Sequence, residues 1–219
     1  MTGSQIRAVA FDVDGTLYAN RRMYLASLPL VLRHSALFRA FAEARREVRR
    51  IGCVTDITSF QAEFVADRLG RTVGWARRAI DRVIYGAWER GLRRVPLRPG
   101  TRDLLRWLRE HGYLVGALSD FPVVDKLTRF GVVASFDQVL NCEETGCLKP
   151  HPRPLLELCS RLGVPADQVL YVGNSARYDL GVARAAGAHG LLIRAFSFVK
   201  PAPHSVAALP ELTDRLQRV

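Results

Sequence analysis

Residues 6–17 read IRAVAFDVDGTL, and this stretch decides the fold. Its first part, IRAVAFD, is mostly apolar, which is typical of a strand that is buried on both faces within a parallel sheet. The Asp14-Gly15 pair then ends the strand, because glycine tolerates the backbone angles of a sharp exit. We therefore predict a buried strand over residues 6–12 with a polar loop at its carboxyl end.

The second half of the chain repeats this pattern of apolar strand followed by helix. Helices are predicted between these strands from their caps and periodicity, as at Thr101, which follows Pro99-Gly100. Strands that alternate with helices indicate a doubly wound (Rossmann-like) α/β domain with a parallel sheet. The further strands are predicted over residues 113–118, 136–141, 168–172 and 189–194, and the helices over residues 101–111, 152–162 and 178–187.

Residues 18–96 show no strand pattern. Three amphipathic helical stretches are predicted there instead, over residues 22–50, 59–69 and 73–90. We therefore predict an α/β core formed by residues 1–17 and 97–219, interrupted by a smaller all-helical domain. A short helix from residue 209 is predicted to end the chain.

Composition places the chain among ordinary globular proteins, with 48% hydrophobic and 24% charged residues. No apolar run approaches the ~20 residues that a membrane-spanning helix needs, and residues 1–5 lead into a strand rather than a signal peptide. We expect a cytoplasmic protein with no membrane partner. The four cysteines fit neither a disulfide framework nor a zinc motif, so we expect free thiols at Cys53, Cys142, Cys147 and Cys159.

The formal net charge of +11 is the unusual feature of the composition. A positive field raises the encounter rate of anionic substrates, but it also attracts nucleic acid without sequence specificity. The arginines, such as Arg45-Arg46 and Arg49-Arg50, are scattered over helices without interleaved aromatic residues. We interpret them as solvated helix faces and expect no specific nucleic-acid partner.

Asp12 and Asp14 lie at the end of the first predicted strand, two positions apart. Residues at this spacing point to the same side of a strand, so the two carboxylates can converge on one ligand. Because neighbouring carboxylates repel, they need a cation or a shared proton between them. On its own the pattern is weak, since Asp-Gly also simply makes turns.

Polar residues also follow three of the other predicted strands. Leu118-Ser119-Asp120 closes the second, Lys149-Pro150 follows the third, and Gly173-Asn174-Ser175-Ala176-Arg177-Tyr178-Asp179 follows the fourth. The ligand crevice of a doubly wound sheet lies at the carboxyl ends of its strands. We therefore expect these residues to meet Asp12 and Asp14 in one site.

In this combination and order the chain resembles the haloacid dehalogenase-like superfamily. The motifs of that family are Asp-x-Asp-Gly-Thr, a hydrophobic strand ending in Ser or Thr, a Lys, and Gly-Asp followed five residues later by Asp. The resemblance runs from Phe11 to about Gly187, and the helical insertion resembles the cap that the family places after its first motif. It implies a phosphatase acting on a small phosphorylated metabolite.

The resemblance assigns roles to the motif residues. Asp12 would attack phosphorus and form an aspartyl-phosphate, being ionised at neutral pH with an ordinary pKa of about 3.9. Asp14 would protonate the leaving group and then activate water, which requires a raised pKa. Ser119 and backbone N–H groups near Asp14 and Asp120 would hold the phosphoryl oxygens, and Lys149 would neutralise their charge.

Mg²⁺ is the cofactor that the resemblance implies, and it prefers oxygen ligands. The implied ligands are a carboxylate oxygen of Asp12, the backbone carbonyl of Asp14 and the first acidic position of the fourth motif. That position is Asn174, a departure that leaves Asp179 as the only acidic residue of the motif and predicts weaker Mg²⁺ binding. Arg21 and Arg22 are candidates for binding a second anionic group of the substrate, although an exposed basic stretch is the simpler interpretation.

Three alternatives to a phosphatase remain open at this point. A halide-releasing enzyme is disfavoured by Asp14, since such enzymes typically lack the second acidic residue. A phosphomutase would use the same two aspartates. A non-catalytic protein that binds phosphometabolites or nucleic acid is the remaining class, with a degraded site signalled by Asn174 and Asp120. The oligomeric state cannot be read from the sequence.

Overall fold

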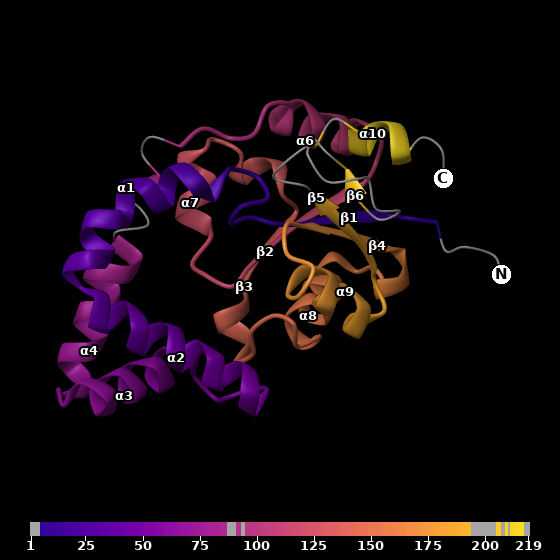
Figure 1. Cartoon of the computed structure of the whole chain (residues 1–219). Coiled ribbons are helices and arrows are strands. Elements are labelled where there is room, and N and C mark those ends of the chain that lie inside the picture. Colours follow the sequence, from indigo (N-terminus) through magenta and orange to yellow (C-terminus); the bar gives the residue numbers. More distant parts are fainter. Residues whose placement is uncertain are drawn as a thin grey trace.

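The computed structural model describes residues 5–86, 91–92, 95–193, 205–206, 209 and 211–216 (Figure 1). The described strands form a six-stranded sheet in the order β3-β2-β1-β4-β5-β6, and every neighbouring pair is parallel. This order confirms the predicted doubly wound sheet, with the decisive first strand at its centre. The strands are β1 (Ala8–Asp12), β2 (Leu114–Ser119), β3 (Gln138–Asn141), β4 (Val169–Gly173), β5 (His189–Ile193) and β6 (Ser205–Val206), of which the last was not predicted.

Helices cover both faces of the sheet because β1 is apolar on both sides. Val9 and Phe11 pack against α6 (Thr101–Glu110) and α10 (Glu211–Leu216), whereas Ala8 and Ala10 face α8 (Arg153–Leu162) and α9 (Asp179–Ala186). Figure 1 shows these two helix layers on opposite sides of the sheet. The predicted helices 101–111, 152–162 and 178–187 are confirmed within one or two residues. The shorter helices of the core are α7 (Val124–Arg129), η2 (Val133–Ser135), η3 (Cys142–Thr145) and η4 (Ala166–Gln168).

The segment between β1 and α6 is helical, as predicted, but its helices are divided differently. The single helix expected over residues 22–50 is two helices, because His34 leaves helical geometry with φ −118° and ψ 31°. The helix expected over residues 73–90 changes to a π-helix at Ile80, and residues 87–90 lie outside the described part of the chain. The elements are α1 (Asn20–Arg33), α2 (Ser35–Ile51), α3 (Ile57–Leu69), α4 (Val73–Ala79) and η1 (Ile80–Tyr85).

These helices have a hydrophobic core of their own. Phe41 of α2, Val65 of α3 and Ala76 of α4 are buried together, apart from the two clusters that flank the sheet. An antiparallel bridge between Tyr18 and Leu97 holds the two connecting segments side by side. The helices thus form a cap on the sheet domain, and we propose residues 18–96 as its extent. Among the described residues, no helix combines the length and apolar character needed to cross a membrane.

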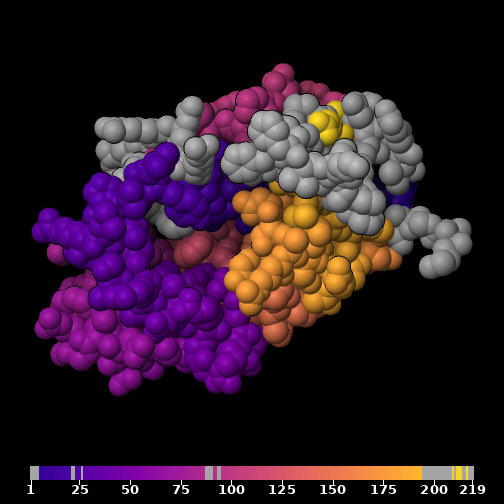
Figure 2. All heavy atoms as spheres, viewed as in Figure 1, coloured from indigo at the N-terminus to yellow at the C-terminus, as the bar shows by residue number. Residues whose placement is uncertain are grey.

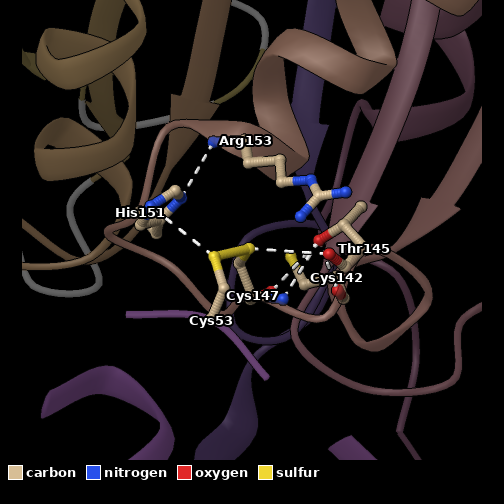
Figure 3. Close-up of a disulfide and its surroundings, with 6 residues drawn as sticks. All are labelled: Cys53, Cys142, Thr145, Cys147, His151 and Arg153. Atoms are coloured by element: carbon tan, nitrogen blue, oxygen red, sulfur yellow. Dashed lines mark hydrogen bonds between the residues drawn. A yellow bond between two sulfur atoms is a disulfide. The ribbon is translucent and has the colours of Figure 1, made fainter. Parts of the chain in front are cut away.

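The expectation of four free thiols is wrong for one pair. Cys53 and Cys147 form a disulfide across 94 positions of sequence (Figure 3). Cys142 and Cys159 are free and buried, as expected. The pairing could not be inferred from the sequence because it depends on how the helical segment after α2 folds back onto the loop after β3.

Candidate active site

Asp12 and Lys149 form the centre of the site. Asp12 ends β1 and is 4% exposed. Its Oδ1 accepts a hydrogen bond from Lys149 Nζ at 2.7 Å, and its Oδ2 accepts one from Thr16 Oγ1 at 2.7 Å. The two residues are 137 positions apart in sequence, so their contact is the direct result of placing β1 and the loop after β3 at one edge of the sheet.

Lys149 is shared between two carboxylates. Besides Asp12, it contacts Asp179 Oδ1 at 2.7 Å and the Tyr171 hydroxyl at 3.1 Å. Burial alone would lower the pKa of Lys149, but the charges of Asp12 and Asp179 raise it well above its ordinary value. Lys149 is therefore a fixed buried cation between two carboxylates that would otherwise repel each other.

Asp179 also organises the loop after β4. Its Oδ2 accepts backbone hydrogen bonds from Asn174 at 3.0 Å and from Ser175 at 2.9 Å. This arrangement fixes the loop that carries Asn174 relative to Lys149. Both oxygens of Asp179 are engaged within the protein.

Burial raises the pKa of Asp12 to about 7, because a carboxylate loses its hydration there. The Lys149 charge opposes this rise, and the nearby Asp179 and Asp14 charges add to it. The assumption of an ordinary pKa near 4 for Asp12 is thus corrected. A cation at the site would favour the ionised form, which is the form a nucleophile needs.

Asp14 is held by a cation that the sequence did not reveal. Lys126 of α7 donates to both its oxygens, at 2.7 and 2.8 Å, while Ser119 Oγ donates at 2.6 Å and the Tyr18 hydroxyl donates as well. Burial would raise the pKa of Asp14, but the charge and hydrogen bonds of Lys126 outweigh it and lower that pKa. The expectation of a raised pKa for Asp14 is therefore wrong.

Asn174 lies directly over the first motif. Its Nδ2 donates to the Asp14 carbonyl oxygen at 3.1 Å. Gly15 permits this approach, since a Cβ at that position would lie 1.8 Å from Asn174 Nδ2. Rotation of the amide by half a turn would present its oxygen beside that carbonyl. The Asp12 carboxylate, the Asp14 carbonyl and the Asn174 amide are then an all-oxygen donor set of the kind that Mg²⁺ prefers, so the residues fit the ion.

The site opens into a cavity of about 240 Å³ whose walls come from both parts of the chain. The sheet domain contributes Asp12, Asp14, Lys149 and Asn174, and the helical cap contributes Tyr24 and Arg49. Figure 2 shows the surface hollowed between the purple helices and the orange part of the core. The side chains of Arg21 and Arg22 lie outside the described part of the structure, although both residues belong to α1.

Comparisons with known proteins identify the family. Residues 6–187 match the model of the haloacid dehalogenase-like hydrolases. The chain belongs to this family. The prediction made from the four motifs is confirmed.

Curated relatives of this HAD-like hydrolase include phosphatases. Phosphoglycolate phosphatase of Yersinia pseudotuberculosis is 32% identical over 187 residues, which cover 83% of this chain and 78% of the relative. Glyceraldehyde 3-phosphate phosphatase of Methanopyrus kandleri is 28% identical, covering 94% and 91%. The structure of a HAD phosphatase from Thermococcus onnurineus has a TM-score of 0.66 at 24% identity, covering 96% and 98%, and supports the fold.

In this HAD-like hydrolase, two arginines of α2 join the cap to the site. Arg49 pairs with the Asp120 carboxylate at 2.6 Å and donates to the Lys149 carbonyl at 2.9 Å. Arg45 is 4% exposed and pairs with Glu143 at 2.5 Å, while donating to the Asp120 carbonyl at 2.6 Å. The interpretation of these arginines as solvated is wrong for Arg45 and Arg49, because the pattern of one helix does not reveal which face the core will cover. Asp120, predicted to bind substrate through its backbone, lines the cavity and also bonds to both arginines of the cap.

Replacing Arg45 by Met is expected to lower the free energy of unfolding by about 3 to 5 kcal/mol, because Glu143 would remain buried without its cation. Urea denaturation followed by circular dichroism measures this loss. Arg46→Met is the matched control, since Arg46 is exposed on the same helix and its loss should cost no more than about 0.5 kcal/mol. Equal effects of the two substitutions would show that the buried network does not stabilise the cap.

Proposed function

We propose that this HAD-like hydrolase is a Mg²⁺-dependent phosphatase that acts on a small phosphorylated metabolite through an aspartyl-phosphate on Asp12. One observation carries the proposal: Asp12, Asp14 and Lys149 line the same small cavity as Asn174. Phosphatases among the curated relatives, which match over most of the chain, support the same reaction.

In the first step the Asp12 carboxylate attacks phosphorus and the bond to the leaving oxygen breaks. Lys149, with Nζ 2.7 Å from Asp12, is placed to neutralise charge on the phosphoryl oxygens. Ser119 would turn its hydroxyl from Asp14 toward the same oxygens. In the second step water displaces the carboxylate of Asp12, so that phosphate is released and the nucleophile is restored.

Asp14 has two proposed tasks, and its surroundings bear differently on each. In its ionised form, held by Lys126, it can take a proton from the water of the second step. To act as an acid in the first step it must carry a proton. A phosphate dianion in the site would favour this protonated form of Asp14, because a nearby negative charge raises the pKa of a carboxyl group.

The Asp12 carboxylate, the Asp14 carbonyl and the Asn174 amide would hold Mg²⁺. The ion would supply positive charge that favours ionised Asp12 and draws electron density from the phosphoryl group. Asp179, a predicted ligand, is already bonded to Lys149 and to two backbone N–H groups. We propose that Asp179 positions Lys149 and Asn174 rather than binding the ion directly.

The substrate is proposed to be small and to carry a second anionic group. The cavity holds about 240 Å³, and Arg49 of the cap lines it together with the motif residues. Arg21 and Arg22 remain candidates for the same task from α1. The first compounds to test are 2-phosphoglycolate and glyceraldehyde 3-phosphate, the substrates named for the curated relatives.

Phosphate release from these compounds and from p-nitrophenyl phosphate should require Mg²⁺ and stop with EDTA. Asn174→Asp should lower the Mg²⁺ concentration for half-maximal activity by roughly tenfold, because a charged oxygen replaces a neutral one. A Mg²⁺ titration of the initial rate measures the difference.

Asn141→Asp is the control, because it is the same substitution at a position on β3 that is not among the residues lining the cavity. It should leave the Mg²⁺ dependence unchanged. Undiminished phosphate release in EDTA would contradict the metal requirement, and an unchanged titration in Asn174→Asp would remove Asn174 from the metal site.

A further inference from the structure

The Cys53–Cys147 disulfide joins the cap to the sheet domain. Cys53 lies between α2 and α3, and Cys147 lies two positions before Lys149. The chain itself crosses between the two parts where Tyr18 pairs with Leu97. The disulfide is therefore a further covalent link between the two parts. It lies just after the C-terminal end of α2, which Figure 1 shows far from the start of α1.

The backbones around this link are in close contact. Val54 N–H donates to the Gly146 carbonyl at 2.8 Å, and a Cβ on Gly146 would lie 2.1 Å from the Val54 carbonyl oxygen. Gly146 has φ +73°, which favours glycine. The cap segment is thus seated directly on the loop that leads to Lys149, and its separation from this loop requires the disulfide to open.

We propose that Cys53–Cys147 is a reversible redox clasp, which fixes the cap segment around Val54 on the loop that leads to Lys149 when oxidised and frees this segment when a dithiol reductant opens it. The clasp is inferred from the disulfide and the contacts around it, independently of the proposed function. Its effect on turnover rests on the proposed phosphatase function. Freeing this segment should loosen the nearby cap and speed exchange of substrate and product, because the cap supplies Arg49 and Tyr24 to the cavity walls.

The surroundings of the two sulfur atoms define the order of the exchange. Cys147 is fully buried, whereas Cys53 is partly exposed, so an incoming thiolate attacks Cys53 Sγ and Cys147 leaves as a thiolate. The second thiol of the reductant then attacks the mixed disulfide and frees Cys53. Two electrons and two protons pass to the protein, and the reductant departs as a disulfide.

His151 is placed to assist this exchange (Figure 3). Its Nδ1 accepts the Arg153 backbone N–H at 3.2 Å, which leaves the proton of the neutral ring on Nε2. Nε2 lies 3.6 Å from Cys53 Sγ, and a ring nitrogen of His151 lies within 4.8 Å of Cys147 Sγ, so the ring is close enough to stabilise a departing thiolate. Burial raises the pKa of the two other thiols, Cys142 and Cys159, which keeps them protonated and unreactive.

The test compares oxidised protein with protein reduced by dithiothreitol. Alkylation in denaturant followed by mass spectrometry should modify Cys142 and Cys159 in the oxidised protein and all four cysteines after reduction. Hydrogen exchange should show the Val54 amide opening at least about tenfold more often after reduction. Turnover should rise at least about threefold.

Cys53→Ser should match the reduced protein under both conditions, while Cys159→Ala, the matched control, should respond to dithiothreitol as the parent does. Three results would contradict the redox clasp. They are alkylation of all four cysteines without reduction, zinc bound to Cys53, Cys147 and His151 in the purified protein, and hydrogen exchange at Val54 that is the same before and after reduction. Absence of phosphate release in both redox states would instead defeat the proposed function, with the thiol count and exchange still deciding the clasp.

Discussion

Asp12→Asn should abolish phosphate release, with a loss of at least about 10⁴-fold in kcat. An amide nitrogen or oxygen cannot form and then release the phosphoryl ester that the proposed reaction requires. The fold should survive, because Asn has nearly the same shape and the change removes one of the negative charges crowded around Lys149. Initial rates with p-nitrophenyl phosphate at saturating Mg²⁺ measure the effect.

Asp67→Asn is the control for Asp12→Asn. Asp67 is exposed on α3, so the same chemical change there should leave kcat unaltered. If Asp12→Asn retained a substantial part of the parent activity, another group would have to be the nucleophile. If both variants lost activity equally, the loss would come from the quality of the protein preparations rather than from the change at Asp12.

Lys149→Met should damage both stability and activity. It leaves Asp12 and Asp179 buried without the cation that both contact at 2.7 Å, and this should lower the free energy of unfolding by about 3 to 5 kcal/mol. Activity should fall by about 10³-fold or more, because no charge remains to balance the phosphoryl oxygens. Urea denaturation and initial rates measure the two effects.

The stability loss in Lys149→Met should depend on pH. Beside Lys149 the folded pKa of Asp12 is already about 7, and loss of that cation raises it further above its unfolded value. The folded variant therefore keeps this proton to a higher pH than the folded parent does. The destabilisation relative to the parent is therefore smallest below about pH 7 and should grow as the pH rises from about 7 to about 9. A loss of stability that is constant over this range would contradict the stranded charges as its cause.

A second substitution separates the two effects of Lys149→Met. Adding Asp179→Asn removes one stranded charge, so the double variant should regain part of the lost stability while remaining inactive. Recovery of activity together with stability would mean that Lys149 serves only the fold. Failure to regain any stability would mean that repulsion between the carboxylates is not what destabilises the single variant.

The sheet was predictable because its signal is local. Residues 6–12 are apolar on both faces, and glycine and proline mark the ends of the neighbouring elements. The break at His34 was not predictable, since the apolar pattern continues through it while the His34 backbone leaves helical geometry. The π-helical turn at Ile80 likewise carries no sequence signature.

The centre of the site was predictable for a topological reason. Parallel strands bring their carboxyl ends to one edge, so Asp12 and Lys149 had to meet despite their distance in sequence. The lowered pKa of Asp14 was not predictable, because it depends on Lys126, whose helix carries no motif. Arg49 and Cys53 make contacts between the cap and the sheet domain. These contacts depend on how the two domains are arranged, which the hydrophobic periodicity of the sequence does not predict.

The most direct measurement is a search for the phosphorylated enzyme. Protein in excess would be mixed with p-nitrophenyl [³²P]phosphate and Mg²⁺, quenched in acid within a single turnover and digested for mass spectrometry. We expect a hydroxylamine-labile phosphoryl group on Asp12, appearing before free phosphate and absent from Asp12→Asn. Phosphate formed without any labelled protein, or a label carried by another residue, would contradict Asp12 as the nucleophile.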